Sequence, residues 1–479
     1  MTQTNNLTRR SLLNRLSFGL GGMALADCLN PASSSAATTQ GLPNLPHFAP
    51  KAKRVIVLFM SGGFSQFESF DYKPELVKRT GTELPDSLKN GRQKLLGMSG
   101  NQAHFTLAAP AVKFNQYGKS GQWVSDHYPH LGKMADDLCI IKTMKSDAVN
   151  HDPAMIFMQS GNQLPGRPSM GSWISYGLGT EQADLPSYIV MVSRRVIDQP
   201  LSSRLWDSGF LPTQYQGVQF RASKDPVLYL HSPAGITAGN DQSAFARYKE
   251  MQKLKQATAT EAEIEARIAQ YEMAFKMQAS IPEVTDVTHE PDSIYDLYGP
   301  DARKPGSFAS NCILARRLSE KGVRFIQLYH PGWDHHTALC TAMPDQAREV
   351  DQPTAALIQD LKNRDLLKDT LVVLATEFGR TCYSQGKYRT DPVINFGREH
   401  HRDCFSFVLA GGGIKGGMSY GETDELGFSI AENPVHVNDF HATLLHLLGI
   451  NHERFTYRFQ GRDYRLTDVA GKVVNAILA

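Results

Sequence analysis

The sequence predicts an α/β protein with a doubly wound, mostly parallel sheet and helices on both of its faces. Short, continuous apolar runs rich in Val, Ile and Leu recur along the chain, and such runs are typical of parallel strands buried on both faces. Helical segments lie between several of these runs, as the crossover between parallel strands requires. Because 41% of the 479 residues are hydrophobic, the chain can fill a large core.

Six apolar runs are the predicted strands. Several of them end in a polar or Gly-rich turn, such as the one at 61–63, which marks the edge of the sheet. The predicted strands cover residues 55–60, 138–142, 187–192, 323–328, 370–375 and 405–410.

Four segments are predicted helices, and the last of them is followed by Gly449, a residue favoured just past a helix end. The predicted helices cover residues 152–159, 308–321, 353–363 and 439–448. A long helical insertion at about 242–283 is rich in Ala, Glu, Lys and Gln. Residues 80–125 and 200–240 lack periodicity and are expected to be loop-rich insertions. Together these elements predict a single domain over residues 51–479.

The N-terminus is predicted to direct export. Arg9 and Arg10 form a twin-arginine motif, and the weakly apolar stretch from Leu16 to Ala26 is too short for a stable membrane anchor. We therefore expect residues 1–40 to be a twin-arginine signal peptide and small-residue linker. The twin-arginine translocase would be a partner, and the mature protein would be periplasmic or extracellular. The cleavage position and lipidation at Cys28 stay open.

Charge and cysteine content narrow the function classes. The chain has 50 basic and 48 acidic residues, a net charge of +2, and no dominant basic stretch, which argues against nucleic acid as a partner. Its six cysteines are scattered and form no CxxC pair, which argues against a thiolate zinc site.

The segment 329–336 carries the strongest sign of chemistry. Asp334 and His336 alternate, so both side chains point to one side if the segment is extended. They follow the predicted strand at 323–328, and ligands bind beyond the carboxyl ends of strands in open α/β sheets. A carboxylate and an imidazole at that edge predict a divalent metal site.

Polar residues also follow other predicted strands, and we expect them to meet at the same edge. Asn150 and His151 follow the second strand, although the alternative for them is a cluster that caps a helix. The fifth strand leads to Glu377 and Arg380, and the segment 397–403 precedes the last strand and could fold back over the edge. Arginines of these segments are candidates for binding an anionic group of a substrate. The alternative is that they form salt bridges on the protein surface. These arginines are Arg380, Arg398 and Arg402.

Longer motifs are distributed over nearly all of the predicted mature part of the chain. They lie at 61–66, 70–74, 150–152, 160–161, 168–173, 332–336, 376–381, 397–400 and 411–417. With these motifs the chain resembles the bacterial family called domain of unknown function 1501, which is itself similar to the alkaline phosphatase, sulfatase and cofactor-independent phosphoglycerate mutase superfamily. The resemblance implies an alkaline phosphatase-like domain with a two-metal hydrolytic site.

The resemblance implies an uneven set of metal ligands. Asp334, His336 and His400 match the ligands of the first metal, with His401 as the alternative to His400, and Glu377 stands where a ligand of the second metal is expected. At two other ligand positions of that second metal the chain has Ser61 and Phe378. His151 stands at the position of the nucleophile. We therefore expect one intact metal site and an impaired second site.

The function predicted from these observations is an exported, metal-dependent hydrolase of a phosphate or sulfate ester, acting through a metal-bound water. The substrate would be a small-molecule or glycan ester, and the metal zinc, manganese or calcium. His151, Asn150 and Arg380 are the candidate catalytic residues, with His151 moving a proton or stabilising charge. The alternative is a non-catalytic exported protein that a metal stabilises and that binds an anionic glycan or a protein partner.

Overall fold

The computed structural model of the chain describes residues 41–89, 102–182, 184–193, 200–221, 227, 281–385 and 396–479. The predicted signal segment 1–40 lies outside the described residues. The predicted helical insertion at 242–283 also lies outside them, apart from its last residues from 281 on. No helix within the described residues is both long enough and apolar enough to span a bilayer.

A central sheet organises the described part of the chain. Its nine strands run in the order β12-β4-β11-β8-β1-β7-β5-β6, with β15 beside β4. Apart from β11, which is antiparallel to both of its neighbours, the paired strands are parallel. The strands are β1 (Arg54–Ser61), β4 (Leu138–Lys145), β5 (Tyr188–Val192), β6 (Val218–Phe220), β7 (Phe325–Pro331), β8 (Thr370–Ala375), β11 (Phe405–Ala410), β12 (Met418–Tyr420) and β15 (Val435–His436).

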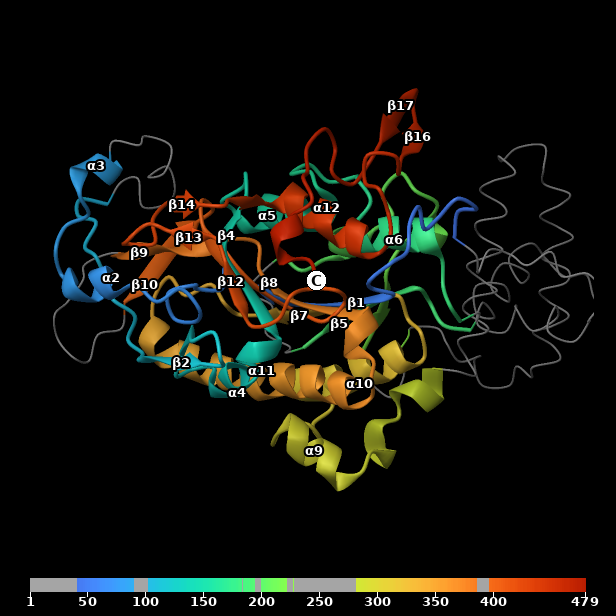
Figure 1. Ribbon diagram of the computed structural model, residues 1–479, viewed down its shortest axis with the longest axis horizontal. Helices are drawn as coiled ribbons and strands as arrows, with labels where there is room; N and C mark the ends of the chain where they lie inside the picture. The colour runs from blue at the N-terminus through green and yellow to red at the C-terminus, as the bar shows by residue number, and fades with distance from the viewer. Residues whose placement is uncertain are drawn as a thin grey trace, which may run out of the picture.

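Helices cover both faces of this sheet, which confirms the predicted doubly wound architecture. In Figure 1, α5 (His151–Ser160), α6 (Met170–Leu178) and α12 (Val437–Leu447) lie above the sheet, and α10 (Phe308–Glu320) and α11 (Leu339–Asn363) lie below it. The shorter helices are α2 (Pro74–Lys78), α3 (Asp86–Lys89), α4 (Pro129–Lys133) and α9 (Asp292–Tyr298).

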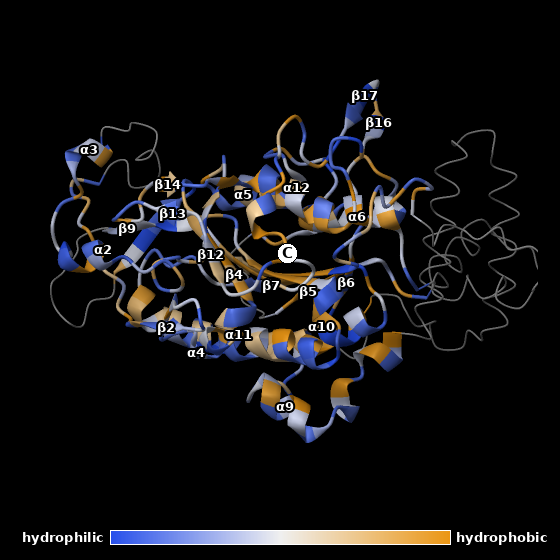
Figure 2. Cartoon of the chain, viewed as in Figure 1, coloured by the Kyte–Doolittle hydropathy of each residue, from blue (hydrophilic) through white to orange (hydrophobic). Residues whose placement is uncertain are grey.

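The strands are apolar on both sides, as Figure 2 shows for the sheet between the two helical layers. Alternate residues of β1 enter two separate cores, because successive side chains of a strand point to opposite faces. The core on one side contains Ile56, Leu58 and Met60, and the core on the other contains Val55, Val57 and Phe59.

All six predicted strands are present, but α11 is much longer than predicted. The sequence suggested a helix from Pro353, whereas α11 begins at Leu339 and contains Pro344 and Pro353 in its interior. A proline inside a helix removes a hydrogen bond and costs about 3 kcal/mol. The buried apolar side chains along α11, among them Met343, outweigh that cost.

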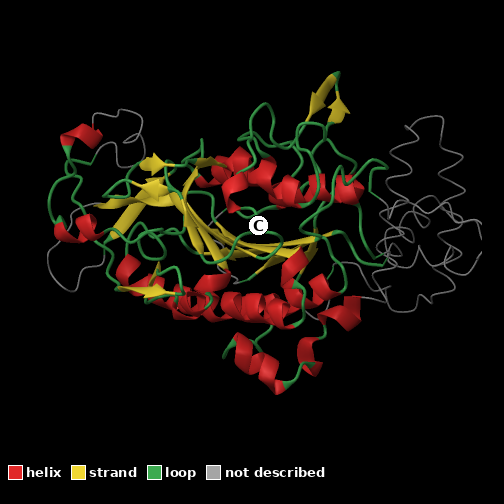
Figure 3. Cartoon of the chain, viewed as in Figure 1, coloured by secondary structure: helices red, strands yellow, loops and turns green. Residues whose placement is uncertain are grey.

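A hairpin outside the central sheet was not predicted as strands. It consists of β9 (Gly379–Gln385) and β10 (Gly397–His401), which pair antiparallel so that His400 lies opposite Arg380. The segment 397–403 thus returns to the edge where β8 ends, as the sequence suggested. Figure 3 also shows the smaller hairpins; their strands are β2 (Phe114–Tyr117), β3 (Gln122–Ser125), β13 (Glu422–Thr423), β14 (Ile430–Glu432), β16 (Tyr457–Phe459) and β17 (Arg462–Tyr464).

Candidate metal centre

Four side chains from three parts of the fold converge beyond the carboxyl end of the sheet. His151 is the first residue of α5, Asp334 and His336 follow β7, and His400 lies in β10. Their potential ligand atoms all lie within 4.8 Å of one another. Of the residues expected from the sequence at the first metal, Asp334, His336 and His400 meet here, and His151 joins them.

The distances within this cluster suit one small cation. Asp334 Oδ1 lies 2.8 Å from His336 Nε2 and 3.2 Å from His400 Nε2, and the two Nε2 atoms are 3.0 Å apart. Asp334 Oδ2 lies 3.2 Å from His151 Nε2. Ligand atoms at the corners of a tetrahedron are roughly 3.3 Å apart when their bonds to zinc are about 2.0 Å long. The four side chains can therefore offer three nitrogens and one oxygen to one small cation.

Each of the three imidazoles also contacts an oxygen of the protein through Nδ1, the ring nitrogen that points away from the cluster. His151 Nδ1 lies 2.7 Å from Glu377 Oε1, His400 Nδ1 lies 2.8 Å from the Val149 carbonyl oxygen, and His336 Nδ1 contacts the amide oxygen of Gln385. An Nδ1–H that donates to such an oxygen fixes the tautomer in which Nε2 presents its lone pair to the cluster. Histidines that bind metals almost always have a partner of this kind.

The electrostatics keep the Asp334 carboxylate ionised. Burial alone raises its pKa, but its contacts with the rings of His151, His336 and His400 and the charge of Arg380 outweigh burial and hold the pKa far below its usual range. Burial lowers the pKa of His151, and its hydrogen bonds with Asp334 and Glu377 reverse this shift and raise the pKa to about 9. The Asp334 carboxylate is therefore ionised at neutral pH, as a carboxylate that binds a metal must be.

Arg380 supports Asp334 from inside the protein. Its buried guanidinium donates to Asp334 Oδ1 at 2.6 Å and to the carbonyl oxygens of four residues of the surrounding loops. Since these bonds occupy the guanidinium, the structure places Arg380 behind the cluster and not against a substrate as expected. The four carbonyls are those of Gly62, Gly63, Trp333 and Arg398.

Arg398 is likewise committed to the protein interior. It is fully buried and donates to both carboxylate oxygens of Glu68, at distances of 2.8 to 3.2 Å. Arg402, by contrast, is partly exposed and donates to the carbonyl oxygen of Asp147. The same pairing engages the buried Glu68 carboxylate.

Side chains at and after the end of β1, and the ring at position 378, do not complete a second metal site. Asp71 pairs with Lys73 at 3.3 Å, and the Ser61 hydroxyl points to the carbonyl oxygen of His330. The buried Phe378 ring packs on two rings of the cluster, with centroids 4.9 Å from His151 and 4.4 Å from His400. Among the described residues, one group of metal-ligand type is present, and it is the cluster around Asp334.

His401 and Asn150 lie beside the cluster and not in it. Neighbouring residues of a strand point to opposite sides, and His401 Nε2 lies 2.8 Å from the carbonyl oxygen of Phe428. Of the two histidines that the sequence left open, His400 is therefore the one that faces Asp334. Asn150 is the N-cap of α5, but its exposed side chain makes no hydrogen bond to the helix.

Two glycines let the loops of the cluster approach one another. Gly62 has a φ of +123°, and a Cβ there would lie 2.6 Å from the backbone nitrogen of Asp334. A Cβ on Gly397 would lie 1.9 Å from the backbone carbon of His336.

Gln385 and Val149, which accept hydrogen bonds from two of the imidazoles, were not predicted from the sequence. An amide side chain and a main-chain carbonyl form no recognisable sequence pattern.

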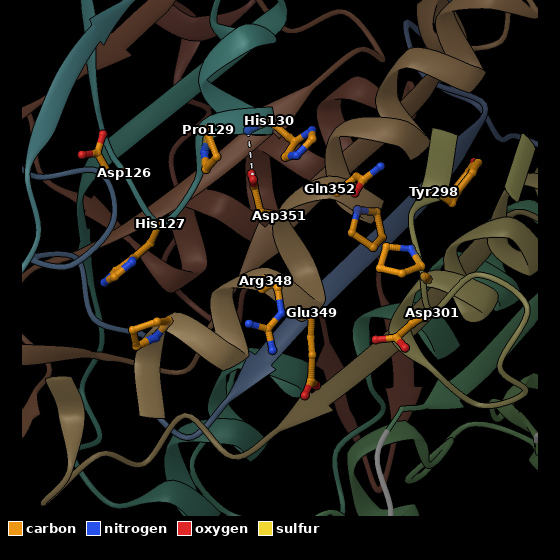
Figure 4. Close-up of a pocket in the computed structure, with 14 residues that line it drawn as sticks. Asp126, His127, Pro129, His130, Tyr298, Asp301, Arg348, Glu349, Asp351 and Gln352 are labelled. Atoms are coloured by element: carbon orange, nitrogen blue, oxygen red, sulfur yellow. Dashed lines mark hydrogen bonds between the residues drawn. The ribbon is translucent and has the colours of Figure 1, made fainter. Parts of the chain in front are cut away.

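A cavity of about 450 Å³ lies elsewhere, where α4, α9 and α11 meet (Figure 4). Asp126, His127, Asp301 and Arg348 are among its lining residues, and none of the four cluster residues lines it. Glu349 in its wall contacts the buried ring of His330, with Oε2 3.0 Å from Nε2. The cavity is thus distinct from the metal centre, although Glu349 touches the strand that leads to it.

Comparisons with solved structures find weak likenesses. A protein in the alkaline phosphatase superfamily from Vibrio parahaemolyticus has a TM-score of 0.34 and 10% identity, and the match covers 93% of this chain and 76% of that one. A sulfatase from Pseudoalteromonas sp. has a TM-score of 0.32 and 13% identity, covering 84% and 68%. A phosphonate monoester hydrolase from Silicibacter pomeroyi has a TM-score of 0.33 and 12% identity, covering 83% and 73%. These values are low, so the fold class rests on the strand order and helical layers described above.

Sequence comparison is more decisive for the family. No curated protein sequence matches the chain. The family described as "Protein of unknown function (DUF1501)" matches residues 52–478, which include both β1 and the last described helices. With all four cluster residues inside that match, the chain belongs to the DUF1501 family.

Proposed function

We propose that this protein is a divalent-metal-dependent hydrolase that acts on a phosphate or sulfate ester. One observation carries the proposal: three imidazole Nε2 atoms converge on the Asp334 carboxylate while an oxygen of the protein holds each Nδ1. A divalent cation bound there supplies a Lewis acid and lowers the pKa of a coordinated water. Three imidazoles favour zinc over calcium or manganese, which prefer oxygen ligands.

The residues of the cluster and their neighbours would have different roles in binding the metal. Asp334 would be the anionic ligand, and His151, His336 and His400 the neutral ones. Arg380 would keep Asp334 ionised and oriented, and Glu377 would orient the His151 ring through Nδ1. A ligand role for His151 departs from the proton-transfer role expected from the sequence, and its 3.2 Å approach to Asp334 supports the change.

The start of α5 supports an anionic substrate. The helix begins at His151, so the partial positive charge of its N-terminus lies beside the cluster. The side chain of Asn150 accepts no hydrogen bond from the first N–H groups of α5, so those of His151 and Asp152 would donate to an anionic oxygen of the ester. The exposed Asn150 amide would add a donor at the same place.

A second candidate is a non-catalytic protein that keeps one metal as a structural support and binds an anionic glycan or a protein partner. The arginines favour this candidate, because Arg380 and Arg398 use their N–H groups in hydrogen bonds within the protein. Neither buried guanidinium is then left to neutralise the charge of a phosphate or sulfate group.

The deciding experiment pairs metal analysis with a panel of chromogenic phosphate and sulfate esters. We expect about one zinc ion per chain, and turnover that chelation abolishes and zinc restores. Because position 151 holds a histidine tied to Asp334 and Glu377, rapid quench with a labelled ester should leave no covalent adduct on the 144–161 peptide. Metal without turnover of any ester would favour the second candidate, and protein without stoichiometric metal would contradict both.

We also propose that the protein is exported through the twin-arginine pathway. Arg9 and Arg10, followed by a short apolar stretch, support this proposal. Export in the folded state would suit a protein that acquires its metal before translocation.

A further inference from the structure

Two buried histidines that do not join the cluster fix its central loop to α11. His330 Nε2 lies 3.0 Å from Glu349 Oε2, and His335 Nε2 lies 2.9 Å from Gln346 Oε1. Gln346 and Glu349 are three positions apart and therefore share one face of α11. Gln346 also donates to the carbonyl oxygen of Pro331 at 3.2 Å. The first half of α11 thus holds the loop between β7 and His336 at several points.

The contacts of His330 allow one orientation and one tautomer of its ring. Trp333 Nε1 lies 3.0 Å from His330 Nδ1, and His330 is fully buried. An indole N–H is a donor only, so Nδ1 must accept and the ring proton must sit on Nε2. That proton is then directed at the Glu349 carboxylate, which makes the bond charge-assisted.

Trp333 connects this ring to the cluster. Its backbone N–H donates to the Ser61 carbonyl at 3.2 Å, and its own carbonyl accepts from Arg380 Nη2 at 3.2 Å. The same Arg380 nitrogen donates to the carboxylate of Asp334, the next residue in the chain. A shift of Trp333 would therefore move both Asp334 and the donor that orients it.

We propose that His330, anchored by Glu349, is a positioning residue of the metal centre. The inference rests on the metal site of the proposed function but not on the identity of the ester. His330→Ala would leave the Trp333 indole N–H buried without its acceptor and free the 331–334 segment to move. Loss of a partner outside the ligand set weakens metal binding by roughly 10- to 100-fold, and we expect about tenfold here because His330 acts through Trp333.

The experiment measures zinc dissociation constants by chelator competition on the folded full chain. His330→Asn should restore binding to within about threefold of wild type, because the Asn oxygen lies near the position of Nδ1 and can accept the indole N–H. Trp333→Phe, which removes that donor together with the pyrrole part of the ring, should weaken binding as His330→Ala does. The control is His452→Ala: this buried histidine bonds to Thr467 at 3.0 Å, so its loss should lower thermal stability and leave zinc affinity unchanged.

Three results would overturn the inference. Zinc binding by His330→Ala at wild-type strength would show that the ring positions nothing. Equal weakening by His330→Ala and His330→Asn would assign the effect to packing. If His330→Ala does not fold, unchanged affinity of Trp333→Phe would refute the role of the hydrogen bond. Wild-type protein that binds no zinc would contradict the proposed metal centre itself, so the two failures are distinguishable.

Discussion

Replacing Glu377 with Gln tests whether the cluster is built to hold a metal. Glu377 is fully buried, and its Oε1 lies 2.7 Å from His151 Nδ1 and accepts from the Gly62 N–H at 2.9 Å. Glutamine keeps an acceptor of the same size for Gly62, so the fold should survive, but the charge-assisted bond to the imidazole is lost. We expect zinc to bind about 10- to 100-fold more weakly, or about 1.4 to 2.7 kcal/mol.

Glu399→Gln is the matched control, and chelator competition with zinc is the assay for both variants. Glu399 is also buried, but its Oε1 lies 3.9 Å from His336 Nδ1 and 4.0 Å from His400 Nδ1, beyond hydrogen-bond reach. Each variant removes one buried negative charge near the cluster, yet only Glu377 holds an imidazole. Glu377→Gln should therefore weaken binding more. Equal weakening would mean that charge alone acts, and the orienting role assigned to Glu377 would be refuted.

Three further predictions concern metal, pH and export. Asp334→Ala and His336→Ala should each reduce bound metal from about one ion per chain to none in elemental analysis, because each removes a ligand; metal retained by both variants would place the site elsewhere. Burial lowers the pKa of His441 to about 4 from an ordinary value of 6.5, so its contribution to stability is complete above pH 6.5 and is lost as the pH falls toward 4. His441→Gln cannot titrate at this position, so its free energy of unfolding in urea should fall by about 3 kcal/mol less than that of wild type between pH 6.5 and pH 4. An equal fall in wild type and variant would contradict this role of His441. Replacing Arg9 and Arg10 with Lys should retain the protein in the cytoplasm. If cell fractionation finds that variant exported as the wild type is, the export proposal is contradicted.

The sequence alone determined the layered architecture and the strand positions. Buried parallel strands need continuous apolar runs, so segments such as 370–375 and 405–410 were visible without any knowledge of their neighbours. The same logic located Asp334 and His336, because polar residues directly after a buried strand must lie at the edge of the sheet. The direction of β11 was not visible, since an apolar run looks the same in a parallel and an antiparallel pair.

Only the tertiary structure decided which side chains meet and what each of them contacts. The choice of His400 over His401 depends on the pairing of β10 with β9, which sets the side that each ring faces. Arg380 was expected to face a substrate, but the carbonyls of loops far away in the sequence surround it. The predicted helix began at Pro353, whereas α11 begins at Leu339 because its buried side chains pack against the rest of the fold. In each case the outcome depends on contacts between distant segments, and a pattern read along the chain contains local preferences but not those contacts.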